Sequence, residues 1–349
     1  MNMKELKDIS WDVTEEEYRA DPALSYSTLA KYERGGFNSI PTLFDKVESP
    51  SLTLGSAVDS LITGGEEEFE SRFIVADFPS VPDSIISIVK ELFDWCNTTN
   101  RALESIKDDF IIQIASKYNY QNNWKPETRA KVIKEKGSEY YSLLYVAGDR
   151  IILNTDTYNT VLAMVDALKT SEATKWYLGI DNPFDNIKRY YQLKFKATLE
   201  DIDYRCMADL LIVNYDEKTI LPVDLKTSYK HSYEFFKSFV EWNYQIQARL
   251  YWRIIRANLD EDEYFKDFKL LDYQFIVVSK DCKPLVWEFP YTSSLGDLVY
   301  GKHESLILRD PFTIGKELSY YLKNNSEVPL GIEINDINNI NYWLNKYAN

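Results

Sequence analysis

The segments KRYYQLKFKAT (Lys188–Thr198), YRCMADLLIVN (Tyr204–Asn214) and TILPVDLKT (Thr219–Thr227) decide the fold of this chain. They are rich in β-branched and aromatic residues, and the first one alternates polar with apolar side chains, as a half-buried strand does. Short polar turns separate the three segments. Three successive strands joined by short turns predict an antiparallel β-meander.

The flanking sequence predicts helices on both sides of this meander. Downstream, we expect a long helix from Ser232 to Ala257, strands at Leu271–Ser279 and Leu285–Phe289, and a helix at Ile334–Lys346. Upstream, helical spacing predicts helices at Tyr26–Arg34, Leu54–Ile62, Pro82–Asn97, Arg101–Tyr118 and Asn154–Leu168, with Lys125–Tyr145 helical or partly mobile. We therefore expect an α/β (α+β) fold, with a central mixed sheet flanked by helices and a helical N-terminal portion.

The composition is that of a globular protein with an acidic balance. The 349 residues include 40 Lys and Arg against 55 Asp and Glu, a net charge of −15. Phosphate binding needs basic side chains that face the ligand, so this acidity argues against a protein that coats DNA. A DNA enzyme stays open, because local charge can oppose net charge.

Other classes find no support in the sequence. No apolar run approaches the roughly 20 residues of a membrane span, and the N-terminus lacks the apolar stretch of a signal peptide. Three scattered cysteines give no disulfide framework, and we expect reduced thiols in a cytoplasmic protein. Without a P-loop motif or a set of four cysteines, we expect neither a bound nucleotide nor an iron–sulfur cluster.

The densest chemical signal begins on the strands of the meander. Residues two apart on a strand face the same side, so Asp224 and Lys226 point together, while Leu225 turns into the core. Asp209 lies on the preceding strand, which a tight turn could place beside them. Two carboxylates supply the hard oxygen ligands that Mg²⁺ prefers, and a lysine can orient an attacking water or offset charge on a phosphate. Taken alone, the Asp-x-Lys triplet is a weak signal, because such triplets are common.

The helix expected after the strands adds Gln247 and Tyr251. They are four residues apart, hence on one helical face, and could bind a phosphate or position the site. A half-buried helix whose tyrosine packs while the glutamine is solvated is the alternative. The ordered set of strand Asp, strand Asp-x-Lys and helical Gln-x-x-x-Tyr is far more specific than any one of its members.

This ordered set resembles the PD-(D/E)XK nuclease superfamily, in its RecB-like branch. Leu54–Asp59 (LGSAVD) looks like the LGSAVH helix of the RecE (exonuclease VIII) family of phage-type exonucleases, with Asp59 in place of the histidine. Tyr18–Ser25 and Ser27–Leu29 are similar to that family's N-terminal segment, and Asn154–Leu178 is similar to its connecting helix.

The resemblance implies a metal site and its ligands. Asp209, Asp224 and the carbonyl of Leu225 would bind Mg²⁺, with Mn²⁺ as a possible substitute, and Asp59 would stand at the histidine ligand position. Lys226 would act on the nucleophilic water or on the phosphorane. Alternatively the ligand is lost, and Asp59 only caps or solvates its helix.

Further roles also follow from the resemblance. Gln247 and Tyr251 would hold the site or the DNA backbone. Gln192 lies where the family often carries an acidic residue, and we interpret it as an ordinary strand residue. Arg205 lies four residues before Asp209, where the family often has lysine.

Local basic charge supports a DNA role. From Lys226 to Arg256 there are six basic residues and two acidic ones, and a second basic cluster occupies the first strand of the meander. The candidates for DNA contact are Lys194, Lys196, Arg205, Lys230, Arg249 and Arg253. For any single one of them, a solvated surface is the simpler interpretation. His231 follows the Asp-x-Lys strand closely and is either a substrate contact or a plain surface histidine.

The activity implied is that of a metal-dependent deoxyribonuclease, most specifically a 5′→3′ exonuclease on linear double-stranded DNA that leaves 5′-phosphates. The resemblance implies DNA recombination or end resection in a bacterial or phage-infected cell. It also suggests a single-strand annealing protein as partner and a homo-oligomeric ring, without a membrane. The alternatives are a DNA-binding or assembly protein with a decayed site, and an endonuclease of the same fold.

The resemblance covers residues 15–75 and 150–290, and we expect a single nuclease domain over residues 1–349. Its parts would be an N-terminal helical part (15–75), a helical insertion (76–180), the catalytic sheet and helix (187–290) and a C-terminal helical tail (291–349).

Overall fold

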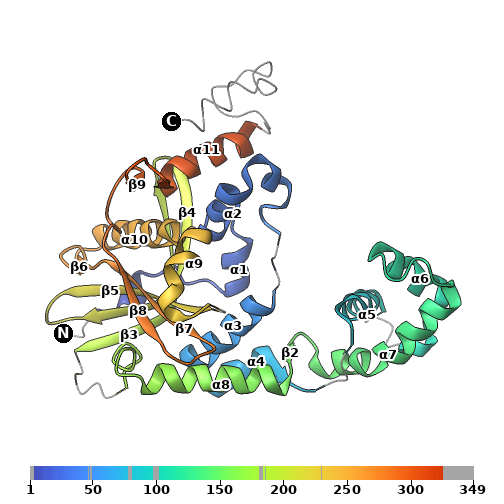
Figure 1. The fold of residues 1–349 in the computed structure, drawn as a ribbon. Helices are drawn as coiled ribbons and strands as arrows, with labels where there is room; N and C mark the ends of the chain where they lie inside the picture. Colours follow the sequence, from blue (N-terminus) through green and yellow to red (C-terminus); the bar gives the residue numbers. More distant parts are fainter. Residues whose placement is uncertain are drawn as a thin grey trace. The chain divides into compact units, whose positions relative to one another are not determined.

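The computed structural model describes residues 4–45, 47, 49–77, 81–96, 102–180, 184, 186–228 and 230–324 (Figure 1). Contacts between Cα atoms divide the chain into two compact units. The sheet unit comprises Met1–Gly55 with Asp166–Asn349, and the helical unit comprises Ser56–Val165. The subdivision into residues 15–75, 76–180, 187–290 and 291–349 stays a prediction.

The sheet unit is built on a mixed sheet of six strands in the order β3-β4-β5-β7-β8, in which β6 also pairs with β5 (Figure 1). The strands are β3 (Ile187–Leu199), β4 (Ile202–Asn214), β5 (Thr219–Ser228), β6 (Lys269–Leu270), β7 (Tyr273–Ser279) and β8 (Leu285–Phe289). The first three pair antiparallel, β7 pairs parallel with β5, and β8 returns antiparallel. The predicted meander, the two downstream strands and the central mixed sheet are confirmed.

Helix α10 (Tyr244–Asp260) connects the parallel strands and packs on β3, β4 and β7. Ile246, Leu250 and Ile254 are fully buried at a spacing of four residues, so one face of the helix enters the core. These residues belong to an apolar cluster of the sheet unit that also includes Phe195 on β3 and Phe275 on β7.

The prediction of one continuous helix over Ser232–Ala257 is wrong. The chain forms η5 (Ser232–Glu234) and α9 (Phe235–Glu241), and then starts α10 afresh at Tyr244. Asn243 between the two helices has a φ of 55°. Asparagine tolerates this left-handed conformation better than most residues do, and here it changes the direction of the chain.

The N-terminal part of the sheet unit is helical, as predicted. Its elements are η1 (Leu6–Ile9), α1 (Glu15–Ala20), α2 (Tyr26–Gly35) and η2 (Gly36–Thr42). Near the other end lie the hairpin strands β9 (Leu298–Tyr300) and β10 (Leu306–Leu308), followed by α11 (Pro311–Asn324). Both α2 and α11 pack against α10. The helix predicted at Ile334–Lys346 lies outside the described residues.

The helical unit has a core of its own, formed mainly by α5, α6 and α7. Its elements are most of α3 (Pro50–Thr63), α4 (Gly65–Arg72), β1 (Phe73–Val75), α5 (Asp83–Cys96), η4 (Leu103–Ser105), α6 (Asp108–Lys117), α7 (Pro126–Ala147), β2 (Ile151–Leu153) and most of α8 (Thr155–Thr170). The upstream helices predicted from helical spacing are present, with one correction: Arg101–Tyr118 is not a single helix, because η4 ends at an extended Ile106 and α6 begins afresh at Asp108. The parallel β1–β2 pair was not anticipated. No helix within the described ranges is long and apolar enough to cross a membrane.

Candidate active site

The candidate site lies where β4 and β5 separate. Their antiparallel ladder ends at the pair Leu210–Val223, while β5 continues to pair with β7 as far as Ser228. Asp209 and Asp224 are the next residues on the two strands, so the register sets them opposite each other. Beyond the ladder, the main-chain N–H of Leu225 donates to the Asp209 carboxylate over 3.1 Å. An acidic side chain thus takes the place of a main-chain partner at this point.

Strand β3 changes its facing side at the same level. Its residue opposite Asp209 is Gln192, which has a φ of 53°, an uncommon conformation for a residue other than glycine. On β4, Ala208 and Leu211 enter one apolar core although they are three residues apart. A strand that alternates regularly would place them on opposite faces. Gln192 lies within β3, as expected, and its positive φ marks this change of face. Its interpretation as a strand residue and not a ligand stays a prediction.

Asp224 is fully buried and incompletely satisfied. Its Oδ1 accepts a hydrogen bond from Nε2 of Gln247 over 2.5 Å, and its Oδ2 lies 2.6 Å from Nζ of Lys226. Apart from this ion pair, Oδ2 accepts no well-aligned hydrogen bond from the residues that the structure describes, and Oε1 of Gln247 accepts none either. Buried oxygens normally have donors, so these two leave capacity for a ligand.

Lys226 is held by charge and by an aromatic ring. Its Nζ lies 4.7 Å from the centroid of Tyr244, at the first position of α10. Burial alone would lower the pKa of Lys226, but the neighbouring charge of Asp224, with Tyr244 and Asp209, raises it above its ordinary value. These neighbours therefore favour the charged ammonium form of Lys226. Leu225, expected in the core, is only half-buried.

Tyr251 lies one helical turn beyond Gln247 and is 8% exposed. Its ring packs against Tyr273, with 6.3 Å between the centroids. Burial, together with nearby groups that include Asp224 and Asp209, raises the pKa of Tyr251 well above its ordinary value. The phenol therefore stays protonated, and it acts as a neutral group beside the carboxylates.

The glycine of the LGSAVD segment has a clear steric role. A Cβ added to Gly55 would lie 3.0 Å from Oγ1 of Thr227 on β5, closer than an ordinary contact, so a larger residue here would require the Thr227 side chain to shift. Asp59, one turn further along α3, is half-buried and belongs to the helical unit. Its place at the metal stays a prediction.

The donor set fits a hard divalent cation. Within the described ranges, no three or more His, Cys, Asp or Glu side chains converge to hold a metal ion. The sheet unit instead offers the carboxylates of Asp209 and Asp224 and the adjacent main-chain carbonyl of Leu225. Asp224 is buried, and its Oδ2 accepts no well-aligned hydrogen bond from the described residues. Oxygen ligands of this kind, completed by water, suit Mg²⁺ or Mn²⁺.

The structure gives the six candidate DNA contacts different surroundings. Arg249 is 1% exposed, and its guanidinium donates to Asp310 and to the carbonyls of Ser294 and Gly296. This side chain fastens α10 to the segment before α11 and is enclosed by protein. Arg205 is also buried, with its guanidinium 4.8 Å from the ring centroid of Tyr18.

The other four are closer to solvent, and each has a protein partner. Lys194 donates to the carbonyl of Val13, and Lys196 pairs with Asp21 at 2.7 Å. Two more contacts are local: Lys230 pairs with Glu241, and Arg253 donates to the carbonyl of Ser293. Direct contact of any of the six with DNA stays a prediction.

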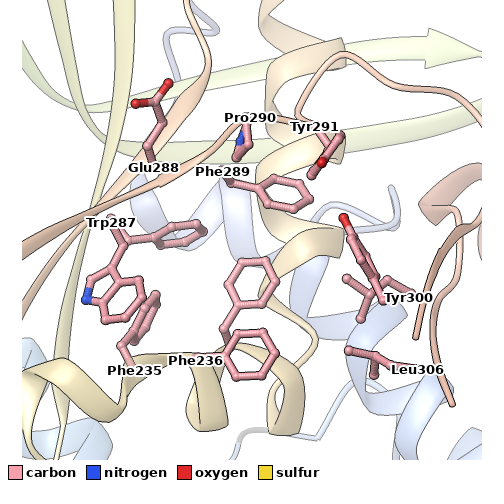
Figure 2. Close-up of a pocket in the computed structure, with 12 residues that line it drawn as sticks. Phe235, Phe236, Trp287, Glu288, Phe289, Pro290, Tyr291, Tyr300 and Leu306 are labelled. Carbon is pink, nitrogen blue, oxygen red and sulfur yellow. The ribbon is translucent and has the colours of Figure 1, made fainter. Parts of the chain in front are cut away.

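Sequence reasoning missed the aromatic support of the site. Tyr244 stacks on Phe235 at 5.6 Å, and both belong to a cluster beside a cavity of about 270 Å³. Figure 2 shows this cavity, with the rings of Phe235, Phe236 and Trp287 on one side and Tyr300 on the other. The carboxylate of Glu288 points away from the rings. The chain has 51 aromatic residues, so an aromatic residue near the site is not distinctive by itself. The only signal in the sequence for the role of Tyr244 was its position three residues before Gln247.

Comparison with known proteins adds little to this geometry. No family model matches the chain, and no curated protein matches it. Among solved structures, the chain is similar to a protein from Eubacterium rectale described as "Putative exonuclease". The two chains are 13% identical with a TM-score of 0.44, and 94% of each is covered. At this TM-score the likeness carries no argument, so a functional assignment depends on the site itself.

Proposed function

We propose that this chain is a metal-dependent deoxyribonuclease of the PD-(D/E)XK type, and specifically a 5′→3′ exonuclease on linear double-stranded DNA. One observation carries the proposal. Asp209, Asp224, Lys226 and Gln247 come from two strands and a helix and meet where β4 and β5 separate. A role in end resection, beside a single-strand annealing protein, is part of the same proposal.

The metal would be held by Asp209, Asp224 and the carbonyl of Leu225. When bound, a Mg²⁺ ion makes a bound water more acidic and offsets the negative charge on the scissile phosphate. Gln247 fixes the orientation of Asp224 through its hydrogen bond to Oδ1, which leaves Oδ2 directed to the ligand side.

Lys226 would act as a cation. Paired with Asp224 through its ammonium, it would bind a phosphate oxygen or orient the attacking water. Charge that develops on the phosphate is stabilised by such a positioned cation without any rearrangement during the reaction. The neutral hydroxyl of Tyr251 can donate a hydrogen bond to the substrate or to a ligand water.

The test is a cleavage assay with the purified full chain. Linear duplex DNA labelled at its 5′ or its 3′ end is incubated with Mg²⁺, Mn²⁺ or EDTA, beside a covalently closed circle. We expect linear DNA to be degraded from its 5′ ends to 5′-phosphate mononucleotides only with metal, and the circle to stay intact. Cleavage of the circle would instead identify an endonuclease. Intact DNA under every condition would overturn the proposal and favour a decayed DNA-binding protein.

A further inference from the structure

Two exposed rings stand parallel immediately after the strand that carries Asp224 and Lys226. The centroids of His231 and Tyr233 are 5.2 Å apart, and their planes differ by 8°. The side chain of His231 is 55% exposed, and Tyr233 is 65% exposed. Most aromatic side chains of the sheet unit lie in its core, so an exposed parallel pair calls for a specific explanation.

The pair is anchored to the sheet by a chain of hydrogen bonds. Nδ1 of His231 lies 2.9 Å from a carboxylate oxygen of Asp281, and the other oxygen of Asp281 accepts from the hydroxyl of Ser279. Ser279 is buried at the end of β7, where it pairs with Ser228 of β5. The rings are therefore held on the same two strands that build the candidate site.

Between the two rings, Ser232 fixes the main chain. It is 1% exposed, its carbonyl accepts from the indole N–H of Trp287 over 3.0 Å, and its hydroxyl lies 3.2 Å from that of Ser279. These contacts hold the main chain between the two rings, and the hydrogen bond to Asp281 holds the imidazole of His231. A rigid surface loses little conformational freedom when it binds a flat ligand.

The rings follow the end of β5, the strand that carries Asp224 and Lys226. Four residues separate Asp224 from Ser228, which is roughly 13 Å along an extended strand. Stacked bases follow one another at about 3.4 Å, so this length corresponds to about four nucleotides. The neighbouring segments, residues 230–241 and 279–283, contain four lysines and three acids, in a chain whose net charge is −15. The local charge thus suits a polyanion better than the rest of the chain does.

We propose that His231 and Tyr233 form a stacking platform for the unpaired bases of a single-stranded DNA segment that leads to the candidate site. This proposal rests on the proposed nuclease function. It adds that the DNA is single-stranded where it approaches the candidate site. Every base has a flat face, so aromatic rings bind single strands without sequence preference. A base pair inside a duplex cannot offer this face.

The test measures binding in EDTA, so that no cleavage occurs, with the full chain and three variants. The probes are a single-stranded oligonucleotide containing 2-aminopurine, whose fluorescence falls on stacking, and a matched blunt duplex. Tyr233→Leu should weaken single-strand binding by about 5- to 150-fold, the range produced by loss of one base–aromatic stack. It should also abolish the quenching, and Tyr233→Trp should restore both. Duplex affinity should change by less than about twofold.

Tyr264→Leu is the matched control, because Tyr264 is 41% exposed and lies in the loop after α10. It should bind both probes as the parent chain does. Single-strand affinity that is unchanged in Tyr233→Leu would overturn the platform and assign the exposed pair to a protein partner. An equal loss for the single strand and the duplex would overturn it too, because stacking would not explain it.

The platform and the nuclease can fail separately. A chain that cleaves no DNA in the assay above but shows binding and quenching that depend on Tyr233 would keep the platform and lose the nuclease. A chain that degrades linear DNA with metal, and binds single strands equally well with leucine at position 233, would keep the nuclease and lose the platform.

Discussion

Two buried carboxylates of the sheet unit, Asp224 and Asp310, have opposite surroundings. They are 0% and 4% exposed, and each is paired with a cation, Lys226 at 2.6 Å and Arg249 at 2.9 Å. Both oxygens of Asp310 also accept main-chain hydrogen bonds, one from the N–H of Gly296 and the other from the start of α11. Asp224 accepts one hydrogen bond, from Gln247, and its other oxygen has only the ion pair with Lys226 within the described part of the chain.

The difference separates a carboxylate that fastens the fold from one that is kept for a ligand. A buried charge with all its hydrogen bonds supplied by the protein stabilises one conformation of the surrounding chain. A buried oxygen without a donor costs stability and is retained where a metal ion or substrate satisfies it. The same substitution, Asp to Asn, should therefore have different effects at the two positions.

The largest effect is expected from Asp224→Asn on activity. Because a neutral amide holds a divalent cation far less well than a carboxylate, the rate of metal-dependent cleavage should fall on the order of 10³-fold, which corresponds to several kcal/mol. The free energy of unfolding should change by less than about 2 kcal/mol, since Lys226 reaches solvent. Single-turnover digestion of end-labelled duplex and urea unfolding measure the two quantities.

Asp267→Asn is its control, because Asp267 is exposed in the loop after α10. It should cleave at the parent rate. If Asp224→Asn also retained the parent rate, Asp224 would not be a metal ligand and the comparison between the two carboxylates would fail.

Asp310→Asn should act on stability. It leaves the enclosed guanidinium of Arg249 without its counter-charge, and breaking a buried pair in this way costs about 3–5 kcal/mol. Urea unfolding measures this loss, and cleavage per folded molecule, assayed well below the unfolding midpoint, should stay within about twofold of the parent. A folded variant without activity would show that Asp310 serves the site and not only the fold.

Local patterns were enough to predict the meander. They were also enough to place the candidate site residues on their strands and helix, namely Asp209, Asp224, Lys226 and Gln247. Strand alternation and short turns are properties of adjacent residues, and the pairing of two strands across a short turn follows from them. The ion pair between Asp224 and Lys226 is a direct consequence of residues two apart sharing a face.

The rest depends on contacts between distant segments. The chain breaks the expected helix at Asn243, gives Gln192 a positive φ and encloses Arg249 against Asp310. None of these features has a local sequence signature, because the neighbours that enforce them lie elsewhere in the chain. Counting the basic residues along α10 therefore predicted a surface that contacts DNA. In the structure, Arg249 of this helix is instead buried in the protein.

A smaller effect tests how Lys226 is held. In Tyr244→Leu the ring beneath the ammonium is lost, and since a cation–π contact contributes about 0.5–2 kcal/mol, kcat should fall by about 2- to 30-fold. Tyr244→Phe keeps the ring and should stay within about twofold of the parent. Steady-state kinetics should place the loss in kcat and leave KM largely unchanged. A rise in KM alone would mean that Tyr244 binds DNA and does not position Lys226.

The smallest effect is expected from a half-buried ion pair near the surface, which is more accessible to solvent than the pairs of Asp224 and Asp310. Glu5 lies 2.7 Å from Lys188 and 2.8 Å from Lys7, and these two hydrogen-bonded ammonium groups lower its pKa from 4.5 to about 2. Because the folded value lies below the unfolded one, the pair stabilises the fold above pH 4.5, and the contribution disappears as the pH falls toward 2. Glu5→Gln should therefore unfold at a slightly lower urea concentration than the parent at neutral pH and at the same concentration near pH 2.

The response to salt distinguishes this solvent-accessible pair from the buried ones. The Glu5 difference should shrink at 1 M salt, where charges are screened within about 3 Å, whereas the cost of Asp310→Asn should persist because solvent does not reach that pair. Glu16→Gln, an exposed change on α1, should match the parent at every pH. A Glu5→Gln difference that grows as the pH falls would reverse the sign of the linkage. It would show that the pKa of Glu5 is raised by folding, and that the contacts with Lys188 and Lys7 do not stabilise its carboxylate.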